Sequence, residues 1–561
     1  MEAGAAGSIG IAVRIAVPAL LFVILCLFAY LRPGVLERIG QAVARFAGHR
    51  PRAIITVATL ALAGRLALIP LLPLPKPVLP DEFGHLLLAE TLVSGRISNP
   101  TPPYWQHIEN MFVLYQPAYQ SKYPLGQATA LSLGLLLFGN PFFGVWLITA
   151  AMCAVFFWML AGWLPAPWAF AGAVLAAIRI ALVSDWINTY MGGSLAALGG
   201  ALTLGALPRI RKRPSAALSF VFGLGIVFIM HTRPFESILF CALTVLLLGP
   251  RLRDFRVILP IAAVIGVAGL GVVGYQNWRV TGSPMLMPYQ AAKKAQGVPQ
   301  GMYWQAPVPR PPLRFQRLAD MYDWQLREHR KGHTLRGYLS ELKQKLGVVY
   351  DFYAGYYFLP AIACALVFWR DWRIRSLAAI IGALFLWSSQ YGYFYEHYFA
   401  AATAAFLMLV MYGFERMSRW RWRGLAVGAC AALTLGLSSI QGVPNTLLRF
   451  ARHPDSMEAA RFRVDLRGPV ESELIRQGGR HIVFVRSHRG METPAVWFYN
   501  GPAVESSPII WAQEIDSPTD REFLNYYRLR RVWVVDADAP VPRLTPYSAA
   551  VSSSLPAQTR Q

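Results

Sequence analysis

Long apolar segments recur along this 561-residue chain, and they constrain its fold more than any other feature. A helix needs about 20 apolar residues to cross the roughly 30 Å hydrocarbon core of a bilayer, and segments of about that length recur here. The chain is 55% hydrophobic with a mean hydropathy of +0.38, above the profile of soluble globular proteins. We therefore expect a polytopic α-helical membrane protein with about 12 transmembrane helices. The predicted spans are 8–31, 53–74, 142–164, 168–184, 191–207, 215–231, 234–250, 257–276, 352–369, 376–394, 397–413 and 424–441.

The formal net charge of +23 would indicate a nucleic-acid partner in a soluble protein. Much of the arginine instead falls in short loops between apolar segments, where it sets membrane orientation, so we expect no nucleic-acid partner. All five cysteines lie inside apolar segments, which is typical of small core residues rather than of a metal site or a disulfide framework. No secretory signal peptide is evident, and the first apolar run is long enough to stay as an anchor.

Basic residues in the short loops form five clusters that predict the topology. The stretch 125–138 is too short for a confident span and is better interpreted as a shallow or re-entrant helix. If it does not cross, all five clusters share one side, which is then cytoplasmic. If it crosses, the first cluster and the later ones fall on opposite sides, so the first alternative is favoured. The five clusters are Arg38, Arg45, Arg50 and Arg52; Arg209, Arg211, Lys212 and Arg213; Arg251, Arg253 and Arg256; Arg370, Arg373 and Arg375; and Arg416, Arg419, Arg421 and Arg423.

This topology divides the chain into a transmembrane domain, 1–441, and an external C-terminal domain, 445–561. External loops at 75–141 and 277–350 belong to the first domain. Segments 481–485 (HIVFV) and 531–537 (RVWVVDA) are β-branched runs, and a helix-like segment precedes each one. Helix-then-strand units predict a small α/β domain with a partly parallel sheet. No glycine fingerprint follows either strand, so a nucleotide site there is unsupported.

An acidic pair, Asp81 and Glu82, lies just past the second predicted span, in the first external loop. A solvated carboxylate at that depth can act as a base toward a substrate whose polar head lies at the membrane surface. The alternative is that the pair caps the helix that follows and complements its dipole. Downstream, Lys122 and Tyr123 precede Pro124 at the next membrane boundary, where a fixed cation beside an X-Pro turn suits a phosphate. Lys122 can equally be an ordinary interfacial lysine that extends toward the head groups.

These residues resemble the first external loop of polyprenyl-phosphate-dependent GT-C glycosyltransferases, a family that includes protein O-mannosyltransferases and aminoarabinose lipid A transferases. The similarity covers roughly residues 53–190, and a Ser-Asp pair at 184–185 outside a later helix is also similar. Two departures concern substrate contacts. Several relatives have Arg and Tyr where this chain has Gly84 and His85, and many have two prolines where Pro124 stands alone. The motif reads Asp81-Glu82-x-x-His85-x-x-x-Ala89-Glu90-x-x-x-x-Gly95-Arg96, then Lys122-Tyr123-Pro124-Leu125.

The resemblance implies a sugar on a lipid phosphate as the donor. Its leaving group is a phosphate of low pKa, which needs no general acid, so the reaction needs only one carboxylate, unlike ordinary glycoside hydrolysis. Asp81 is the candidate base for the acceptor hydroxyl. Lys122 is the candidate cation for the departing phosphate, while Glu82, His85 and Tyr123 are candidate substrate contacts. We expect inversion at the sugar carbon, no cofactor and no dedicated metal cluster.

Further candidate substrate-binding residues lie at other predicted external helix ends. Arg233 and Glu236 suit a lipid phosphate, although an interfacial ion pair explains them as well. Glu396 and His397 lie in a tyrosine-rich stretch that otherwise reads as an aromatic belt, and Asp185 completes the set. Two arginines inside predicted spans, Arg65 and Arg179, each need a partner or a cavity.

The sequence therefore predicts a GT-C-like glycosyltransferase of the bacterial inner membrane, with its active site and C-terminal domain on the periplasmic side. Its partners would be a polyprenyl-phosphate sugar, membrane lipids and an acceptor glycan, lipid or protein that the sequence does not identify. One alternative is a flippase or transporter of lipid-linked saccharides, which should show inverted repeats and midplane polar sites. Ionisable residues here gather at external helix ends instead, which favours chemistry at the surface. A non-catalytic envelope assembly protein is the other alternative.

Overall fold

The computed structural model describes residues 2–248, 255–297, 301–453, 456–463 and 465–547. Contacts divide the chain into two compact units. The helical unit comprises Met1–Leu74, Phe142–Gly271 and Arg336–Pro454, and the sheet unit comprises Pro75–Pro141, Val272–Leu335 and Asp455–Gln561. The predicted cluster residues Arg251 and Arg253, the end of the predicted span 234–250 and the tail from 548 lie outside the described residues.

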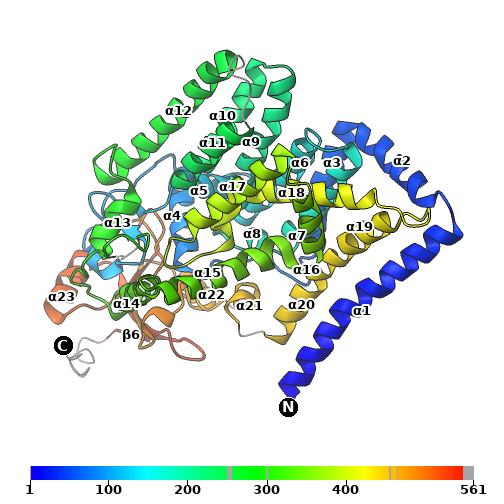
Figure 1. Ribbon diagram of the computed structural model, residues 1–561. Coiled ribbons are helices and arrows are strands. Elements are labelled where there is room, and N and C mark those ends of the chain that lie inside the picture. The colour runs from blue at the N-terminus through cyan, green and yellow to red at the C-terminus, as the bar shows by residue number, and fades with distance from the viewer. Residues whose placement is uncertain (1, 249–254, 298–300, 454–455, 464, 548–561) are drawn as a thin grey trace. The chain divides into compact units, whose positions relative to one another are not determined.

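Helices make up the helical unit, in which α9 packs against both α6 and α10 (Figure 1). Glycines allow α9 and α10 to approach closely, because a Cβ on Gly199 would lie 2.5 Å from the Gly225 carbonyl oxygen. The elements are α1 Glu2–Leu31, α2 Val35–Gly48, α3 Arg50–Ala67, α6 Phe142–Leu160, α7 Ala166–Ile180, α8 Asp185–Asn188, α9 Ser194–Lys212, α10 Ala216–Met230, α11 Pro234–Leu248, α15 Leu335–Val349, the π-helix η3 Tyr350–Ala354, α16 Gly355–Val367, α17 Trp372–Ser388, the 3₁₀-helix η4 Glu396–Ala402, α18 Thr403–Ser418, α19 Val427–Ser438, the 3₁₀-helix η5 Ser439–Gln441 and α20 Gly442–Arg452. Helix α12, Phe255–Thr281, runs from this unit into the other.

Every one of the twelve predicted spans overlaps a helix. By length and composition, four helices among the described residues can cross a membrane, or five if a bent pair at 15–31 and 35–48 forms one span. The chain is therefore a mostly helical protein with several candidate spans, and a total of about twelve remains a prediction. The four helices are Phe142–Leu160, Arg256–Thr281, Glu396–Ser418 and Val427–Arg452, and shorter apolar helices are Leu125–Phe138, Ala166–Ile180, Ala216–Met230 and Pro234–Leu247.

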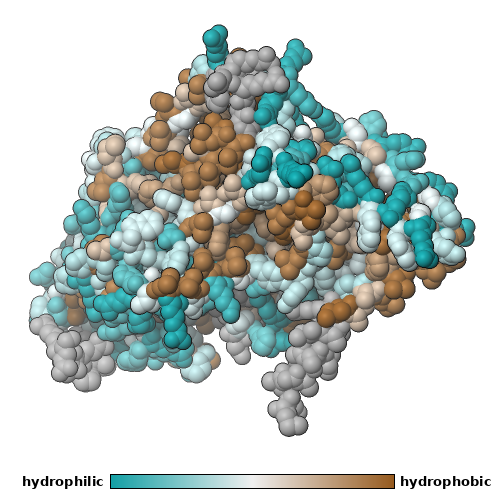
Figure 2. Space-filling view, in the orientation of Figure 1, coloured by the Kyte–Doolittle hydropathy of each residue, from teal (hydrophilic) through white to brown (hydrophobic). Residues whose placement is uncertain are grey.

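Exposed apolar side chains line α12, as expected of a helix that faces lipid. In Figure 2 hydrophobic residues gather on the visible face where α12, α10 and α11 lie. Val264 and Val267 are each more than three-fifths exposed, and only 11% of the most apolar window of α12 is buried. A soluble domain would rarely leave so many large apolar side chains together in water.

The sheet unit contains the first external loop, the segment around 272–335 and the C-terminal residues. Its elements are α4 Pro80–Val93, the 3₁₀-helix η1 Trp105–Ile108, β1 Val113–Leu114, β2 Gln120–Ser121, α5 Leu125–Phe138, α13 Pro288–Gln296, α14 Gln316–Lys331, α21 Met457–Arg463, α22 Gly468–Gln477, β3 His481–Arg486, the 3₁₀-helices η6 Gly490–Glu492 and η7 Ala495–Phe498, β4 Ile509–Ala512, α23 Ser517–Tyr526, β5 Arg531–Asp536 and β6 Leu544–Pro546. Strands β1 and β2 form a short antiparallel hairpin.

A four-stranded sheet with the order β4-β3-β5-β6 forms the C-terminal part of this unit. Strand β3 is parallel to both β4 and β5, while β6 is antiparallel to β5. The predicted strands at 481–485 and 531–537, and their parallel character, are confirmed. One face of the sheet, with Ile482 and Phe484, packs against α23 and against Leu87 of α4 and Tyr115 of the first loop. The sheet therefore supports the loop that carries the acidic pair, and the predicted domain boundary at 441–445 remains a prediction.

Candidate active site

Helix α4 begins at the predicted acidic pair, and Glu82 fixes that beginning. The Glu82 side chain accepts hydrogen bonds from the backbone N–H groups of Val78 and Leu79, at 2.9 and 3.0 Å. Its other oxygen pairs with Arg461 of α21 at 3.0 Å, and the residue is fully buried. This geometry confirms the capping interpretation for Glu82. A contact between Glu82 and a substrate remains a prediction.

Asp81, one position earlier, has a different environment. It is only half-buried, and the Tyr123 hydroxyl donates a short hydrogen bond to its Oδ1 atom. The ring of His85 packs on the Tyr123 ring, with centroids 4.2 Å apart. Tyr123, which is distant in sequence, therefore meets two predicted site residues of α4, Asp81 and His85.

Gly84 provides the space for this arrangement. A Cβ at residue 84 would lie 2.8 Å from a ring carbon of Tyr123 and 3.2 Å from Ser121 Oγ. Any larger side chain would push Tyr123 away from Asp81. Gly84 stands where several members of the resembled family have a larger residue. In this chain, the space beside Gly84 is filled by Tyr123, which reaches Asp81 from a different segment.

Lys122 is buried in a box of aromatic rings. Its Nζ atom lies 3.5 Å from the ring centroid of Phe112, 4.8 Å from that of Tyr289 on α13 and 5.1 Å from that of Tyr123. Lys122 is only 3% exposed. In the part of the chain that the structure describes, its ammonium group has ring contacts but no hydrogen-bond acceptor. Cation–π contacts replace only part of the lost hydration.

This burial lowers the pKa of Lys122 to about 7, and the nearby Asp81 carboxylate opposes the shift. Desolvation disfavours the charged form, and a neighbouring negative charge favours it. An anion that entered the box would raise the pKa of Lys122, as the Asp81 carboxylate does. An anion beside Lys122 would therefore stabilise its charged form.

Phe112 reaches Lys122 through an unusual backbone conformation. Its φ of +64° lies in the left-handed region, which a bulky residue rarely adopts. The hairpin that β1 and β2 form brings Phe112 beside Lys122, whose N–H donates to the Phe112 carbonyl at 3.1 Å. Gln296 of α13 accepts from the Phe112 N–H at 2.9 Å. Strained residues of this kind cluster at functional sites.

The sequence interpretation missed Phe112, Tyr289 and Gln296. An aromatic residue in a loop has no periodic signal, and Tyr289 lies far from Lys122 in sequence. The PYQAAKKAQ segment could have been recognised as a short helix with a proline at its start, but nothing in it indicates which residue it covers.

Glu90 connects the other end of α4 to the C-terminal part of the sheet unit. Tyr499 donates a hydrogen bond to its Oε2 atom at 2.7 Å. Burial raises the pKa of Glu90, and the Tyr499 hydrogen bond and Arg467 oppose this change. Together with the pair of Glu82 and Arg461, this contact holds α4 at both ends.

The other predicted site residues belong to the helical unit. Arg233 and Glu236 make an ion pair at 2.9 Å, and the Arg233 guanidinium lies 3.9 Å from the ring centroid of Tyr398. This confirms the ion-pair interpretation and leaves a phosphate contact as a prediction. Glu396 and His397 approach each other to 3.9 Å.

Asp185 begins the short helix α8, whose next residue, Trp186, packs its ring against Tyr353, with centroids 6.2 Å apart. The Tyr353 hydroxyl donates to the Glu396 carbonyl at 2.8 Å. One tyrosine of the π-helix therefore touches the segments that contain Asp185 and Glu396. Binding of substrate by either residue remains a prediction.

The two arginines inside predicted spans both have partners. Arg65 is fully buried and donates to Asn188 Oδ1 at 3.2 Å and to the carbonyls of Leu72 and Pro73 at 3.0 and 3.2 Å. Arg179 donates to the Phe352 carbonyl at 3.1 Å and also lines a cavity. Among the described residues, no group of three or more His, Cys, Asp or Glu side chains is arranged to hold a metal ion.

The structure is similar to solved structures of two enzymes. One is the Archaeoglobus fulgidus oligosaccharyltransferase tethered with an acceptor peptide, with a TM-score of 0.49 and 9% identity over 87% of this chain and 68% of that chain. Another is ArnT from Cupriavidus metallidurans in the apo state, with a TM-score of 0.48 and 12% identity over 85% of this chain and 92% of that one. ArnT bound to undecaprenyl phosphate has a TM-score of 0.44 and 11% identity over 90% and 93%.

No protein-family model matches the chain, and no curated protein matches its sequence. Both enzymes have the GT-C fold, the family that the loop motif resembles. Identities near a tenth and TM-scores below 0.5 carry no argument about activity, which therefore depends on the residues of this chain.

Proposed function

We propose that the chain is an inverting membrane glycosyltransferase that moves a sugar from a polyprenyl phosphate to an acceptor hydroxyl, on the external face of a bacterial inner membrane. The observation that carries this proposal is the group around Tyr123. The half-buried carboxylate of Asp81 accepts a hydrogen bond from its hydroxyl. The buried ammonium of Lys122, which has no hydrogen-bond acceptor among the described residues, lies beside its ring.

Asp81 is the proposed general base. One carboxylate suffices, because the phosphate leaving group departs without protonation, and Asp81 takes the proton of the attacking acceptor hydroxyl. The hydrogen bond from Tyr123 occupies Oδ1 and orients the carboxylate. The acceptor hydroxyl would then approach the other oxygen, Oδ2.

Lys122 is the proposed partner of the departing phosphate. Negative charge grows on this group as the bond to the sugar breaks, so a fixed cation stabilises the transition state more than the ground state. The aromatic box shields most of the Lys122 side chain from water, which strengthens the interaction. The ArnT structure mentioned above contains undecaprenyl phosphate; for this chain, a lipid phosphate is part of the proposal.

The remaining predicted residues take supporting roles in this proposal. Glu82 holds the start of α4 in place, and His85 supports the ring of Tyr123. Arg233, Glu236 and Asp185, together with the pair of Glu396 and His397, are proposed as further contacts to donor or acceptor, and the C-terminal domain is proposed to be external.

The proposal is tested by supplying membranes that contain the full-length chain with a panel of labelled polyprenyl-phosphate sugars and measuring which label moves and onto what. Lys122→Ala should reduce transfer strongly, and Lys122→Arg should retain more activity because the charge is kept. Lys331→Ala is the matched control, since Lys331 pairs with Glu328 on the exposed side of α14. Movement of the intact donor across the membrane, without transfer, would indicate a flippase and contradict the proposal.

A further inference from the structure

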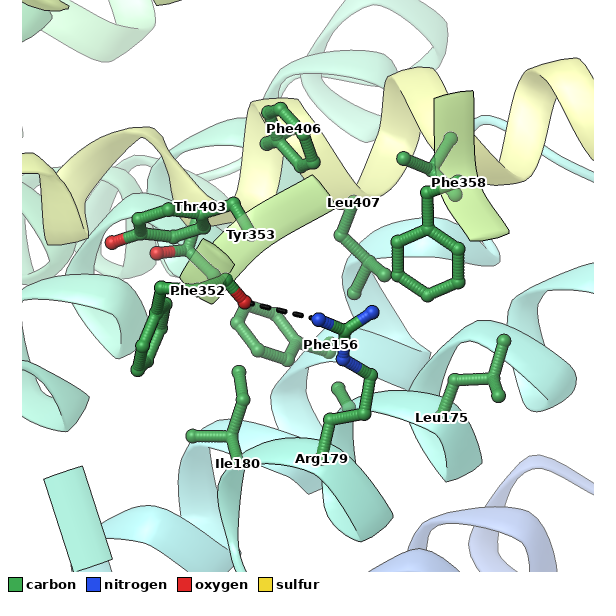
Figure 3. Close-up of a pocket in the computed structure, with 12 residues that line it drawn as sticks. Phe156, Leu175, Arg179, Ile180, Phe352, Tyr353, Phe358, Thr403, Phe406 and Leu407 are labelled. Atoms are coloured by element: carbon green, nitrogen blue, oxygen red, sulfur yellow. Dashed lines mark hydrogen bonds between the residues drawn. The ribbon is translucent and has the colours of Figure 1, made fainter. Parts of the chain in front are cut away.

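A cavity of about 40 Å³ lies inside the helical unit, between α7, α18 and the π-helix η3. By the usual measure of about 10–15 Å³ per water molecule, this is room for a few small atoms. Figure 3 shows aromatic and aliphatic side chains around the cavity and the Arg179 guanidinium pointing into it. The lining residues are Phe156, Leu175, Ala176, Arg179, Ile180, Phe352, Tyr353, Phe358, Thr403, Phe406, Leu407 and Val410.

The guanidinium of Arg179 has fewer acceptors than it can use. A guanidinium carries five N–H donors. Arg179 donates one hydrogen bond, from Nη2 to the Phe352 carbonyl at 3.1 Å. Its carbon Cζ lies 4.5 Å from the ring centroid of Phe358, which accepts no conventional hydrogen bond. Within the described ranges, neither Nε nor Nη1 has a hydrogen-bond acceptor, and no carboxylate pairs with the group.

Two other arginines of the same unit, Arg65 and Arg209, donate more hydrogen bonds to protein oxygens than Arg179 does. Arg65 donates from all three of its nitrogens to protein oxygens. Arg209 donates to the carbonyls of Gly205 and Trp158 at 2.6 and 2.7 Å. Arg179 faces a cavity and has one hydrogen-bond acceptor in the part of the chain that the structure describes, so most of its N–H donors remain available to a ligand.

A cation in apolar surroundings is costly unless an opposite charge compensates it. Arg179 lies inside the predicted span 168–184, near the end of α7 that the predicted topology places on the external side. The cavity walls are apolar apart from Arg179 and the hydroxyl groups of Tyr353 and Thr403. These properties fit an oxyanion that is attached to an apolar chain, because the fork of an arginine matches phosphate and carboxylate oxygens.

The wall opposite Arg179 supports a binding role. Helix η3 is one turn of π-helix, a feature that frequently marks functional sites, and Gly355 follows it with a φ of +59°. Phe352 of this turn packs against Trp186, with ring centroids 4.8 Å apart. A ligand in the cavity would thus contact the element that also touches α8.

We propose that this cavity binds the anionic head of an amphiphile, a phosphate or carboxylate on an apolar chain, with Arg179 as its charge partner. The site goes beyond the proposed transfer reaction, because the donor phosphate is assigned to Lys122 and the present site requires no sugar transfer. Its occupancy would stabilise the helical unit by an amount that grows with the logarithm of ligand concentration once the concentration exceeds Kd.

The test uses the full-length chain purified in a neutral maltoside detergent. Dodecyl phosphate, at a fixed mole fraction of the micelle, is compared with dodecanol and with inorganic phosphate, and the readout is the shift in thermal unfolding temperature. We expect dodecyl phosphate to raise this temperature and the other two to leave it unchanged. The variants are compared in the Lys122→Met background, which removes the cation assigned to the donor phosphate. The shift should persist in Lys122→Met alone, and adding Arg179→Gln should weaken apparent binding about tenfold or more.

A second variant, Ala176→Leu, tests the cavity independently in case Arg179→Gln fails to fold. Ala176→Leu keeps the charge but fills part of the cavity that Ala176 lines, so it should also lose the shift. Full retention of the shift in both variants would overturn the proposal, as would an equal shift with dodecanol. A shift that inorganic phosphate produces alone would contradict a lipid ligand, because a free anion would then suffice.

Discussion

Lys122 shows how one buried charge can set the pH range in which the proposed site works. Burial lowers its pKa from an ordinary 10.5 to about 7, so near neutral pH the free site is only partly protonated. Between about pH 7 and 10.5 the unfolded chain holds this proton and the folded chain does not. Stability therefore rises with pH through this window, and burial of the charged form costs most below pH 7.

Donor binding should show the opposite trend with pH. A bound phosphate requires the charged form, so above pH 7 each pH unit should weaken apparent donor affinity about tenfold. Lys122→Arg should abolish this dependence, because a guanidinium stays charged. The measurement is KM for the lipid donor from pH 6 to 9 in both proteins. The same slope in the arginine variant would contradict the role of Lys122.

Several residues of this site were predictable from sequence, and others were not. Asp81, Lys122 and Tyr123 stood out as charged or turn residues at membrane boundaries, and the structure brings them together. Phe112 and Tyr289 could not be recognised, because their positions depend on the β1–β2 hairpin and on where α13 packs. Local sequence patterns identify the charged residues, but tertiary contacts determine which aromatic rings surround them.

At the scale of elements, the start of α4 contains two carboxylates with different roles. Glu82 stabilises the fold, and Asp81 is the proposed general base. Glu82 bonds two backbone N–H groups and Arg461, whereas Asp81 accepts from Tyr123. Loss of one partner from a buried ion pair leaves the other charge uncompensated, at a typical cost of about 3–5 kcal/mol. Substitution of Glu82 should therefore affect mainly stability, and substitution of Asp81 should affect mainly sugar transfer.

We expect Glu82→Gln to lower the thermal stability of the chain more than Asp81→Asn does, and Asp81→Asn to lower transfer more than Glu82→Gln does. Both changes remove one negative charge and keep size, so each is the control for the other. Thermal unfolding and initial transfer rates on the same preparations give the two orderings. If Glu82→Gln lost transfer while Asp81→Asn kept it, the roles would be reversed.

Elements defined by long apolar runs were the easiest to predict, because the membrane requires such runs. All twelve predicted spans contain helices, and strands β3 and β5 lie where β-branched residues indicated them. Helix α2 was missed because it is amphipathic rather than continuously apolar. Strands β4 and β6 have only four and three residues, too few for a clear alternation.

At the scale of the whole molecule, the distribution of arginine predicts which side of the membrane each segment faces. The positive-inside rule predicts that the five arginine clusters are cytoplasmic and that the sequence after 442 is external. Reporter fusions test this directly. A fusion after Arg423 should report the cytoplasm, and one after Gly442 or at the C-terminus should report the external side. A cytoplasmic C-terminus would remove the sheet unit from the side where the chemistry is proposed.

The central claim is that Asp81 is the base of a sugar transfer from a lipid phosphate. The most direct measurement compares the initial rate of label transfer by Asp81→Asn with that by Asp323→Asn, an exposed aspartate of α14 that pairs with Arg310 at 3.4 Å. Asparagine keeps the size of the side chain but cannot take a proton. We predict normal membrane insertion of both variants, near wild-type transfer by Asp323→Asn and a loss of about 10²-fold or more in Asp81→Asn, the scale of general-base catalysis. Wild-type transfer by Asp81→Asn would contradict the mechanism.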